Sequence, residues 1–454
     1  MDWYPLRLTT PVKQHVFGGR VLAGRLGRTG LPDGPVAETW EVSDVDGEGA
    51  RVADGSLAGH TLRRLVEEHP DELMGRGWRG PRFPVLTKFI DGTGTLPVHL
   101  HADDDTARRL EGEPHGKTEA WHVLDAAPGA TALVGTKPGV DRDTLHRALL
   151  AQDFDAVLRR LPVRAGQTVY VPGGTLHSFG PGTLVYEIEQ TSDIQQHAMR
   201  RHMEDGSELD DEEWHANLGR LLDEWRPGPR PEFHSGLSVR VDDGVERTVL
   251  CAGPYFALER WRAGTSAPLV HDFSTALVVS NAGAPVTVES GGRSERLGRA
   301  RTLLLPAALG RVRIEGPADV LLGYLPDLEQ DIRTPLLAAG HGAAAVAALG
   351  EGLSPGDGAT IPWTFDEDRV TPRSPRVPST GRAGAPPTCR SCRGGRVPDA
   401  APCSAPPAPP PPGPCGRAVG GRSPCPSGRP TCRAATSAAS SGRPSSRSGP
   451  ARTR

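Results

Sequence analysis

Two histidines separated by one residue are the first side chains in this sequence whose types and spacing could do chemistry. In "LPVHLHADDD" (residues 96–105), His99 and His101 alternate with Val98 and Leu100. Side chains at alternate positions of a β-strand point to the same face, so both imidazoles would lie on one wall. Such a pair can bind a metal ion, or it can simply belong to a half-exposed strand.

Two later motifs supply further groups for a metal site. In "GQTVYVPGGTLHSF" (residues 166–179), Pro172 and Gly174 end a strand sharply and return His177 toward the interior. In "GKTEAWHVL", Glu119 begins another apolar strand. Three imidazoles and one carboxylate suit Zn²⁺, Mn²⁺ or Fe²⁺, and they leave positions open for substrate oxygens. Asp103, which follows the histidines, is expected to cap a short helix instead.

Carboxylates form a second candidate group on the predicted strand 183–191. Glu187 and Glu189 share one face of it, opposite Tyr186 and Ile188. If that face is the interior of a barrel, Glu187 could serve as a catalytic base or as an orienting group. The alternative is that both carboxylates face solvent.

Lysine is rare in this chain, with four lysines against 48 arginines. Lys117, two residues before Glu119, is the best candidate for a titratable or phosphate-contacting amine. Lys88 lies among apolar residues, so it is either a cation on the inner face or a side chain that reaches out to solvent. Lys13 and Lys137 are expected on the surface.

These residues must be positioned by short strands, because turns rich in glycine and proline follow each apolar run. Many short strands of this kind indicate a mainly β protein, a sandwich or a barrel. The predicted strands are 83–91, 119–126, 131–136, 167–173 and 183–191. The predicted helices, from helical spacing of apolar residues, are 61–75, 144–161 and 207–225.

Charge divides the 454 residues unevenly. The formal net charge of −3 combines −17 over residues 1–368 with +14 over residues 369–454. The acidic part argues against a nucleic acid or a membrane surface as partner. No apolar run approaches the roughly 18–20 residues that span a bilayer, and the first residues lack a secretory signal, so we expect a cytoplasmic protein.

The last 86 residues differ in composition from the rest. The segment 369–454 has no aromatic residue and few branched aliphatic residues, so we expect it to be disordered. It is either a basic, proline-rich arm or an out-of-frame reading. It holds every cysteine except Cys251, and the pair Cys389 and Cys392 leaves zinc binding there open. A single cysteine in the larger part argues against a disulfide-stapled scaffold.

Several motifs together resemble a known family. They are "AETWEVSD" (37–44), "FPVLTKFID" (83–91), "VHLHADD" (98–104), "GKTEAWHVLDAAPGA" (116–130) and "VPGGTLHSFGPGTLVYEIEQTSD" (171–193). In this order they resemble the type I phosphomannose (mannose-6-phosphate) isomerases, zinc-dependent cupins, over about residues 5–330. The resemblance implies two cupin jelly-roll β-barrels with inserted α-helices. It also implies metal ligands and substrate-side residues, and the ligands would be His99, His101, Glu119 and His177.

Four positions near the substrate are singled out by the resemblance. It implies roles for Lys117, Glu187 and Asp193, whereas His197 stands where the family usually has an arginine. An arginine is always charged and can clamp an anion, but a histidine is charged only under some conditions. The chain departs from the family pattern at three more positions, since Pro97 replaces a serine, His99 a glutamine and Phe17 a tryptophan.

The resemblance also implies a division of the chain. The expected parts are a catalytic metal-binding cupin (1–205), a helical connector (206–236), a degenerate second cupin (237–330), a small helical or irregular extension (331–368) and the tail (369–454). The second cupin carries "LLLPAALGRV" where a ligand-bearing turn would be, without a histidine, so we expect it to be structural.

The implied activity is isomerisation of a small phosphosugar, between mannose 6-phosphate and fructose 6-phosphate. A proton would move between C1 and C2 through a cis-enediol, with a divalent metal polarising the oxygens and a positioned base carrying the proton. Two alternatives stay open. One is a divergent metal cupin that acts on another sugar or small oxyanion, and the other is a non-catalytic sugar-binding bicupin. The sequence predicts no oligomeric state.

Overall fold

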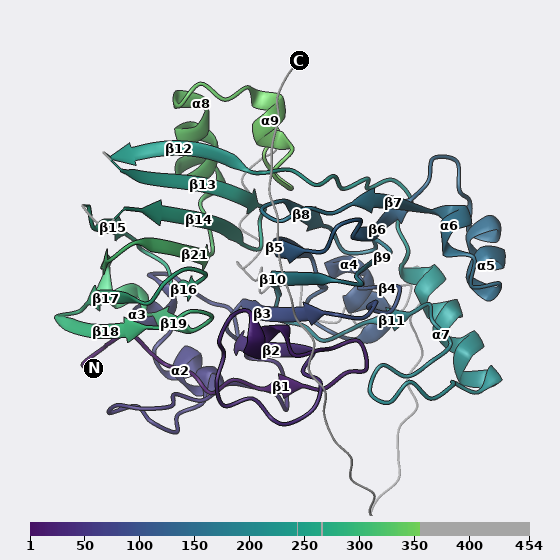
Figure 1. Ribbon diagram of the computed structural model, residues 1–454, viewed down its shortest axis with the longest axis horizontal. Coiled ribbons are helices and arrows are strands. Elements are labelled where there is room, and N and C mark those ends of the chain that lie inside the picture. Colours follow the sequence, from purple (N-terminus) through teal and green to yellow (C-terminus); the bar gives the residue numbers. More distant parts are fainter. Residues whose placement is uncertain (243, 265–266, 355–454) are drawn as a thin grey trace, which may run out of the picture. The chain divides into compact units, whose positions relative to one another are not determined.

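Short antiparallel strands build two halves that repeat one topology (Figure 1). The computed structural model describes residues 1–242, 244–264 and 267–354. The tail from residue 369, its cysteine pair and the last part of the expected extension lie outside the described residues. In the described part, no helix is both long and apolar enough to cross a membrane.

The first half contains two sheets. The larger has the strand order β1-β2-β3-β10-β5-β8, and the smaller has the order β11-β4-β9-β6-β7. The bounds of these strands are β1 Val12–Lys13, β2 Glu38–Val42, β3 Val85–Gly92, β4 His99–Leu100, β5 Glu119–Ala126, β6 Thr131–Thr136, β7 Leu158–Pro162, β8 Thr168–Val171, β9 His177–Phe179, β10 Thr183–Gln190 and β11 Gln196–His197. Apolar side chains from both sheets, among them Trp121 of β5 and Phe179 of β9, share one core.

The second half repeats this order, except that β11 has no counterpart in it. Its sheets have the orders β12-β13-β14-β21-β16-β19 and β15-β20-β17-β18, so that each strand number exceeds that of its counterpart by eleven. The bounds are β12 Leu237–Asp242, β13 Val245–Ala252, β14 Ala257–Ala263, β15 Leu269–Asp272, β16 Leu277–Asn281, β17 Val286–Ser290, β18 Arg293–Leu297, β19 Thr302–Leu305, β20 Arg311–Glu315 and β21 Ala318–Tyr324. The expected mainly β fold is confirmed.

Helices lie between the strands and after β21. They are α1 Val21–Gly24, α2 Leu62–Glu68, α3 Pro70–Met74, α4 Asp104–Thr106, α5 Arg142–Leu150, α6 Phe154–Val157, α7 Asp211–Glu224, α8 Thr334–Ala338 and α9 Ala343–Ala347, with single turns η1 Ala107–Glu111, η2 Ala307–Leu309 and η3 Leu328–Arg333. The side chain of Asp103 accepts a hydrogen bond from the Thr106 amide at 2.8 Å, so the expected cap on the short helix after the histidines is confirmed.

Two predicted helices were too long. The helix expected at 61–75 is divided after His69, because Pro70 starts a new helix and provides no amide hydrogen for the first one. The helix expected at 144–161 ends at Leu150, and α6 then ends at Val157. Its last apolar residues, Leu158 and Leu161, belong to strand β7 instead. Pairing with β6 overrides the helical spacing there.

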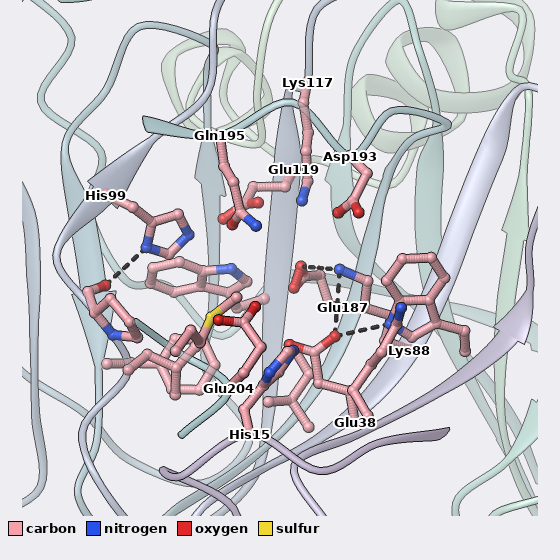
Figure 2. A pocket seen from close by; sticks show the side chains of 18 residues that line it. His15, Glu38, Lys88, His99, Lys117, Glu119, Glu187, Asp193, Gln195 and Glu204 are labelled. Carbon is pink, nitrogen blue, oxygen red and sulfur yellow. Dashed lines mark hydrogen bonds and ion pairs between the residues drawn. The ribbon is translucent and has the colours of Figure 1, made fainter. Parts of the chain in front are cut away.

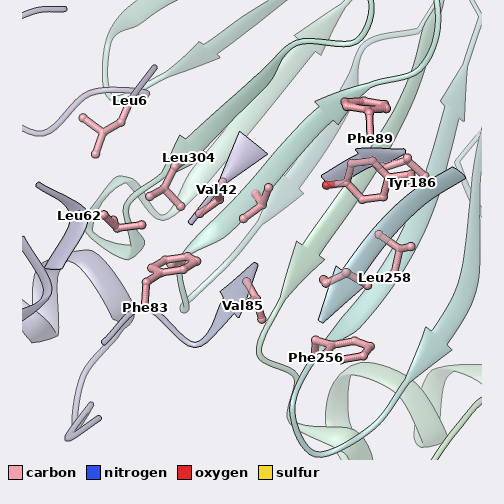
Figure 3. Packing of buried hydrophobic residues seen from close by; sticks show 14 of the residues in the cluster. Leu6, Val42, Leu62, Phe83, Val85, Phe89, Tyr186, Phe256, Leu258 and Leu304 are labelled. Carbon is pink, nitrogen blue, oxygen red and sulfur yellow. The ribbon is translucent and has the colours of Figure 1, made fainter. Parts of the chain in front are cut away.

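The two halves pack through one large apolar cluster (Figure 3). Phe89 of β3 and Tyr186 of β10 meet Phe256 and Leu258 of the second half in it. Tyr186 is fully buried, and its hydroxyl lies 2.9 Å from the hydroxyl of Ser280 on β16. This packing uses the face of β10 opposite to Glu187, so one strand serves the junction and the interior of the first half.

A polar chain continues from that contact across the junction. Ser280 Oγ lies 2.8 Å from Thr302 Oγ1, which donates a hydrogen bond to Glu41 Oε2 at 3.1 Å. Glu41 on β2 forms a buried ion pair with Arg28 at 2.7 Å. Along this chain, hydroxyl and carboxylate groups of the two halves thus contact one another across the junction.

Truncation of Phe256 tests the junction. Phe256 is fully buried, so Phe256→Ala is expected to lower the free energy of unfolding by about 3–5 kcal/mol through lost burial and a cavity. Chemical denaturation measures the change. The control Val270→Ala removes a side chain that is 36% exposed and should change stability by less than about 0.5 kcal/mol. Equal effects of both variants would show that this cluster does not hold the halves together.

Candidate metal centre

Three imidazoles converge in the first half. His99 on β4 and His177 on β9 are direct cross-strand partners, and their Nε2 atoms lie 3.0 Å apart. His101, just after β4, lies with its ring centroid 4.9 Å from that of His99 and 5.1 Å from that of His177. The structure therefore places His99 and His101 side by side, as the period of a strand predicted, and brings His177 to them.

Glu119 reaches the same point from the opposite sheet. It is the first residue of β5, and its carboxylate oxygens lie 3.1 Å from His101 Nε2 and 3.1 Å from His177 Nε2. The four candidate ligands thus come from two sheets, and their donor atoms face one another in the interior.

Backbone carbonyls fix the orientation of each imidazole. The Nδ1 atoms of His99, His101 and His177 lie 2.7, 2.7 and 2.8 Å from the carbonyl oxygens of Pro97, Ile194 and Thr175. Since a carbonyl only accepts, Nδ1 carries the hydrogen and Nε2 presents its lone pair. This is the usual arrangement of metal-binding histidines, in which the second nitrogen is held by an outer partner.

The donor set fits a divalent metal ion. Ligand atoms about 2.1 Å from one ion are separated from each other by about 3.0–3.4 Å, which matches the spacing of these donors. His101 Nε2 and Glu119 Oε1 are buried without a hydrogen-bond partner, an arrangement that a cation would satisfy. Burial lowers the pKa of all three histidines, so the imidazoles are neutral and able to coordinate.

A second buried cluster lies beside the histidines and consists of lysines and carboxylates. Lys88 Nζ on β3 lies 2.9 Å from Glu189, 3.8 Å from Glu187 and 3.7 Å from Glu38. Lys117 Nζ lies 3.2 Å from the other oxygen of Glu189. Glu187 and Glu189 are both buried, so the interior alternative for this strand face is correct, and Lys88 is a cation on the inner face.

The charged groups in this cluster shift the pKa values of one another. Burial alone would lower the pKa of Lys88, but the carboxylates of Glu187 and Glu189 raise it well above its usual value. Burial alone would also lower the pKa of Lys117, but the carboxylate of Glu189 raises it. Burial, and then the charge of Glu189, raise the pKa of Glu187 well above its usual value. The cluster therefore combines two permanent cations with a carboxyl group that binds a proton readily.

One narrow cavity of about 120 Å³ opens between the histidines and the lysine cluster (Figure 2). Among the predicted residues, His99, Lys117, Glu119, Glu187 and Asp193 line it. The sequence alone did not single out the further lining residues Lys13, His15, Glu38, Trp40, Gln195 and Glu204.

Two of these additional lining residues could have been predicted from the sequence. Glu38 and Trp40 lie on one face of β2, within the quoted motif "AETWEVSD", and the period of a strand would have paired them. Lys13, expected on the surface, also lines the cavity. Its amine lies 4.4 Å from the Trp40 ring and 2.8 Å from Glu48, because the short β1 pairs with β2.

His197 lies behind His99. The two residues pair across β11 and β4, and their rings are stacked with centroids 5.9 Å apart. Burial lowers the pKa of His197, so it is neutral at neutral pH. It supports the His99 ring, but it is outside the set of described residues that line the cavity.

Helix α7 holds the strand that carries His197. The side chain of Gln196 on β11 donates a hydrogen bond to Glu224 Oε1 near the end of α7 at 3.1 Å. Burial, and then the neighbouring Glu111 carboxyl, raise the pKa of Glu224 to about 8. The helix thus supports the metal centre through a carboxyl group that is mostly protonated at neutral pH.

Comparisons with known proteins agree with this geometry. No protein-family model matches the chain. It is 29% identical over 328 residues to the mannose-6-phosphate isomerase ManA of Bacillus subtilis, covering 72% of this chain and all of the relative. It is 28% identical over 321 residues to the mannose-6-phosphate isomerase of Streptococcus mutans, covering 70% of this chain and 98% of the relative.

Solved structures give the same result. The crystal structure of the mannose 6-phosphate isomerase from Bacillus subtilis superposes with a TM-score of 0.64 and 26% identity, covering 71% of this chain and 100% of that one. The resemblance to phosphomannose isomerases is therefore confirmed in sequence and in fold.

Removal of one imidazole tests the metal centre. The full chain is expected to bind one divalent ion tightly, and His101→Ala should weaken binding at least about 100-fold because a buried donor is lost. Calorimetric titration of the metal-free protein with Zn²⁺ measures this. The control His215→Ala removes an exposed histidine on α7 and should bind like the unaltered protein. Equal affinities of both variants would contradict the assignment.

The pH dependence of stability tests Glu224. A carboxyl group whose pKa is about 8 in the folded protein and near 4.5 when unfolded destabilises the fold as pH rises from 4.5 to 8. Glu224→Gln removes this cost, so the variant should unfold at a higher temperature than the unaltered protein at pH 8. The difference should shrink toward pH 4.5, as thermal unfolding across that range will reveal. A difference independent of pH would contradict the raised pKa.

Proposed function

We propose that this chain catalyses the reaction for which its relatives are named, the interconversion of mannose 6-phosphate and fructose 6-phosphate. The observation that carries the proposal is one cavity with two walls of different chemistry. Two of the four candidate metal ligands, His99 and Glu119, line one side, and the buried cluster of Lys88, Lys117 and Glu187 lines the other.

His99, His101, Glu119 and His177 would hold the metal ion, and we propose zinc because nitrogen and carboxylate donors of this kind suit it. The ion would supply polarisation of the carbonyl and hydroxyl oxygens of the open-chain sugar.

Glu187 is our candidate for the group that moves the proton between C1 and C2. It lines the cavity, and its pKa is raised by burial and by the charge of Glu189. A carboxyl group with a raised pKa is a stronger base than an ordinary carboxylate, as proton abstraction from carbon requires. Asp193 lies on the same cavity and is a candidate for orienting a substrate hydroxyl.

Lys88 and Lys117 would stabilise the negative charge that develops as the proton leaves the sugar. Both amines are buried and stay charged, because carboxylates raise the pKa of each. Preorganised charges in a dry site stabilise a developing oxyanion more than water does. The positive charge of these two lysines also explains how the site tolerates His197, a neutral imidazole, where the family usually has an arginine.

We further propose that the first 205 residues carry the chemistry and that the chain works in the cytoplasm. Both groups of potential metal-binding side chains found in the described residues lie within those 205 residues. Residues 206–236 would then connect this cupin to a second one at 237–330, with 331–368 as an extension and 369–454 as a tail without a catalytic role.

Isomerisation of a different sugar is the second candidate function. The observation in its favour is that Pro97, which lines the cavity, stands where the family usually has a serine, and that His197, behind His99, stands where it usually has an arginine. The metal centre and the proton-transfer group would be unchanged, so a comparison of substrates separates the two functions.

The direct test is conversion of mannose 6-phosphate to fructose 6-phosphate by the full chain loaded with zinc. Glu119→Ala should abolish turnover together with tight metal binding, because it removes a buried ligand. Glu187→Gln should lower kcat by about 10²- to 10⁴-fold while metal content stays the same, because only the proton-transfer group changes.

Two outcomes would contradict the proposal. No turnover of mannose 6-phosphate by folded, zinc-bound protein would exclude this substrate, and turnover of unphosphorylated mannose under the same conditions would favour the second candidate. Full activity of Glu187→Gln would exclude that residue as the base but leave the reaction itself in place.

A further inference from the structure

Four arginines line a second cavity, at the junction of the two halves. The cavity has a volume of about 400 Å³ and includes Arg7 from the N-terminal segment and Arg28 from the loop after α1. The second half contributes Arg296 on β18 and Arg301 next to β19. We call these four residues the arginine pocket. It is unexpected in a segment of 368 residues whose net charge is −17.

The carboxylates near the arginine pocket compensate only part of its charge. Arg28 is paired with the buried Glu41 at 2.7 Å, and Arg7 is paired with Glu295 at 3.0 Å and with Asp54 at 3.8 Å. Arg301 instead donates to the neutral oxygens of Thr29, at 2.9 and 2.8 Å. Within the described ranges, neither Arg296 nor Arg301 has an ion pair. Four guanidinium groups therefore face three carboxylates, which leaves an excess of positive charge in the arginine pocket.

A phosphate group fits this excess in the sign of its charge and in shape. A phosphate monoester carries nearly two negative charges at neutral pH, and guanidinium groups bind its oxygens with paired hydrogen bonds. Burial and the positive charge of Arg28 lower the pKa of Arg301, which agrees with a local excess of positive charge. A bound anion would relieve this repulsion.

The arginine pocket is separate from the metal centre but shares a strand with it. Glu38 and Trp40 of β2 face the cavity of the metal centre, whereas Glu41 faces the arginine pocket. The two cavities have no lining residue in common among the described residues. An anion in the arginine pocket would therefore lie behind the strand that forms one wall of the metal site.

We propose that the arginine pocket is a second binding site, which takes the phosphate group of a small molecule. Free inorganic phosphate and the phosphate of a sugar share this chemistry. The proposal does not rest on the isomerase activity, because it concerns binding at residues that the activity does not use.

Calorimetric titration of the full chain with inorganic phosphate and with mannose 6-phosphate tests the site. Arg296→Gln and Arg301→Gln are each expected to weaken one binding event at least about tenfold. Arg64→Gln removes an exposed arginine that is paired with Glu68 and should have no effect. The same comparison cancels any contribution from the arginines of residues 369–454, since every variant contains them.

Lys117→Ala alters the cavity at the metal centre, so it distinguishes binding there from binding in the arginine pocket. Lys117→Ala should retain the phosphate binding that Arg296→Gln and Arg301→Gln weaken. Arg296 is exposed, so its replacement should leave the fold intact, as circular dichroism will verify even if Arg301→Gln unfolds. Equal affinities for both ligands would show that the arginine pocket recognises the phosphate group alone. Tighter binding of mannose 6-phosphate would show that it recognises a phosphosugar.

The proposal is overturned if neither ligand binds, or if Arg296→Gln binds both as tightly as the unaltered protein. It is also overturned if Lys117→Ala removes all phosphate binding, because the metal centre would then account for it. None of these results depends on turnover, so a failure of the isomerase proposal is distinguishable from a failure of this one.

Discussion

The burial of Lys88 among three carboxylates is the interaction on which the rest of the site depends. A buried charge is costly unless it is paired, and here one ammonium group satisfies Glu38, Glu187 and Glu189 at once. Glu189 in turn holds Lys117. The interior can be polar because the charges compensate each other, and that leaves a strongly shifted carboxyl group beside a set of neutral imidazoles.

The arrangement of two facing sheets makes this compensation possible. The lysine and most of the carboxylates come from neighbouring strands of the larger sheet, whereas the histidines come from the smaller sheet. Glu119, at the start of β5, belongs to the larger sheet but points its carboxylate at His101 and His177. It is the residue that joins the two clusters, and a small change in the packing of the sheets would separate them.

The sequence predicted the histidine cluster well because its spacing is local. The period of a strand placed His99 and His101 on one wall, and the glycine–proline turn indicated where His177 returns. The strands at 119–126 and 131–136 agree with the structure residue by residue. The interior position of Glu187 followed only from the resemblance, because strand periodicity gives two faces without saying which one is buried.

What the sequence could not predict was contact between distant segments. Lys13 reaches the cavity only because β1 pairs with β2, and nothing in "TTPVKQH" signals that pairing. The helix predicted through Leu161 was wrong because strand pairing competes with helix propensity. The arginine pocket joins residues almost 300 positions apart, so its charge excess is invisible in any local window.

The hydrogen bond between Tyr186 and Ser280 has a consequence for the order in which the protein is made. Tyr186 lies on β10, the strand that carries Glu187, and its hydroxyl is buried against a residue synthesised 94 positions later. Until β16 has been translated, the apolar face around Tyr186 is uncovered and its hydroxyl lacks the contact with Ser280. The strand that carries Glu187 therefore reaches its final packing only when residues of the second half are in place.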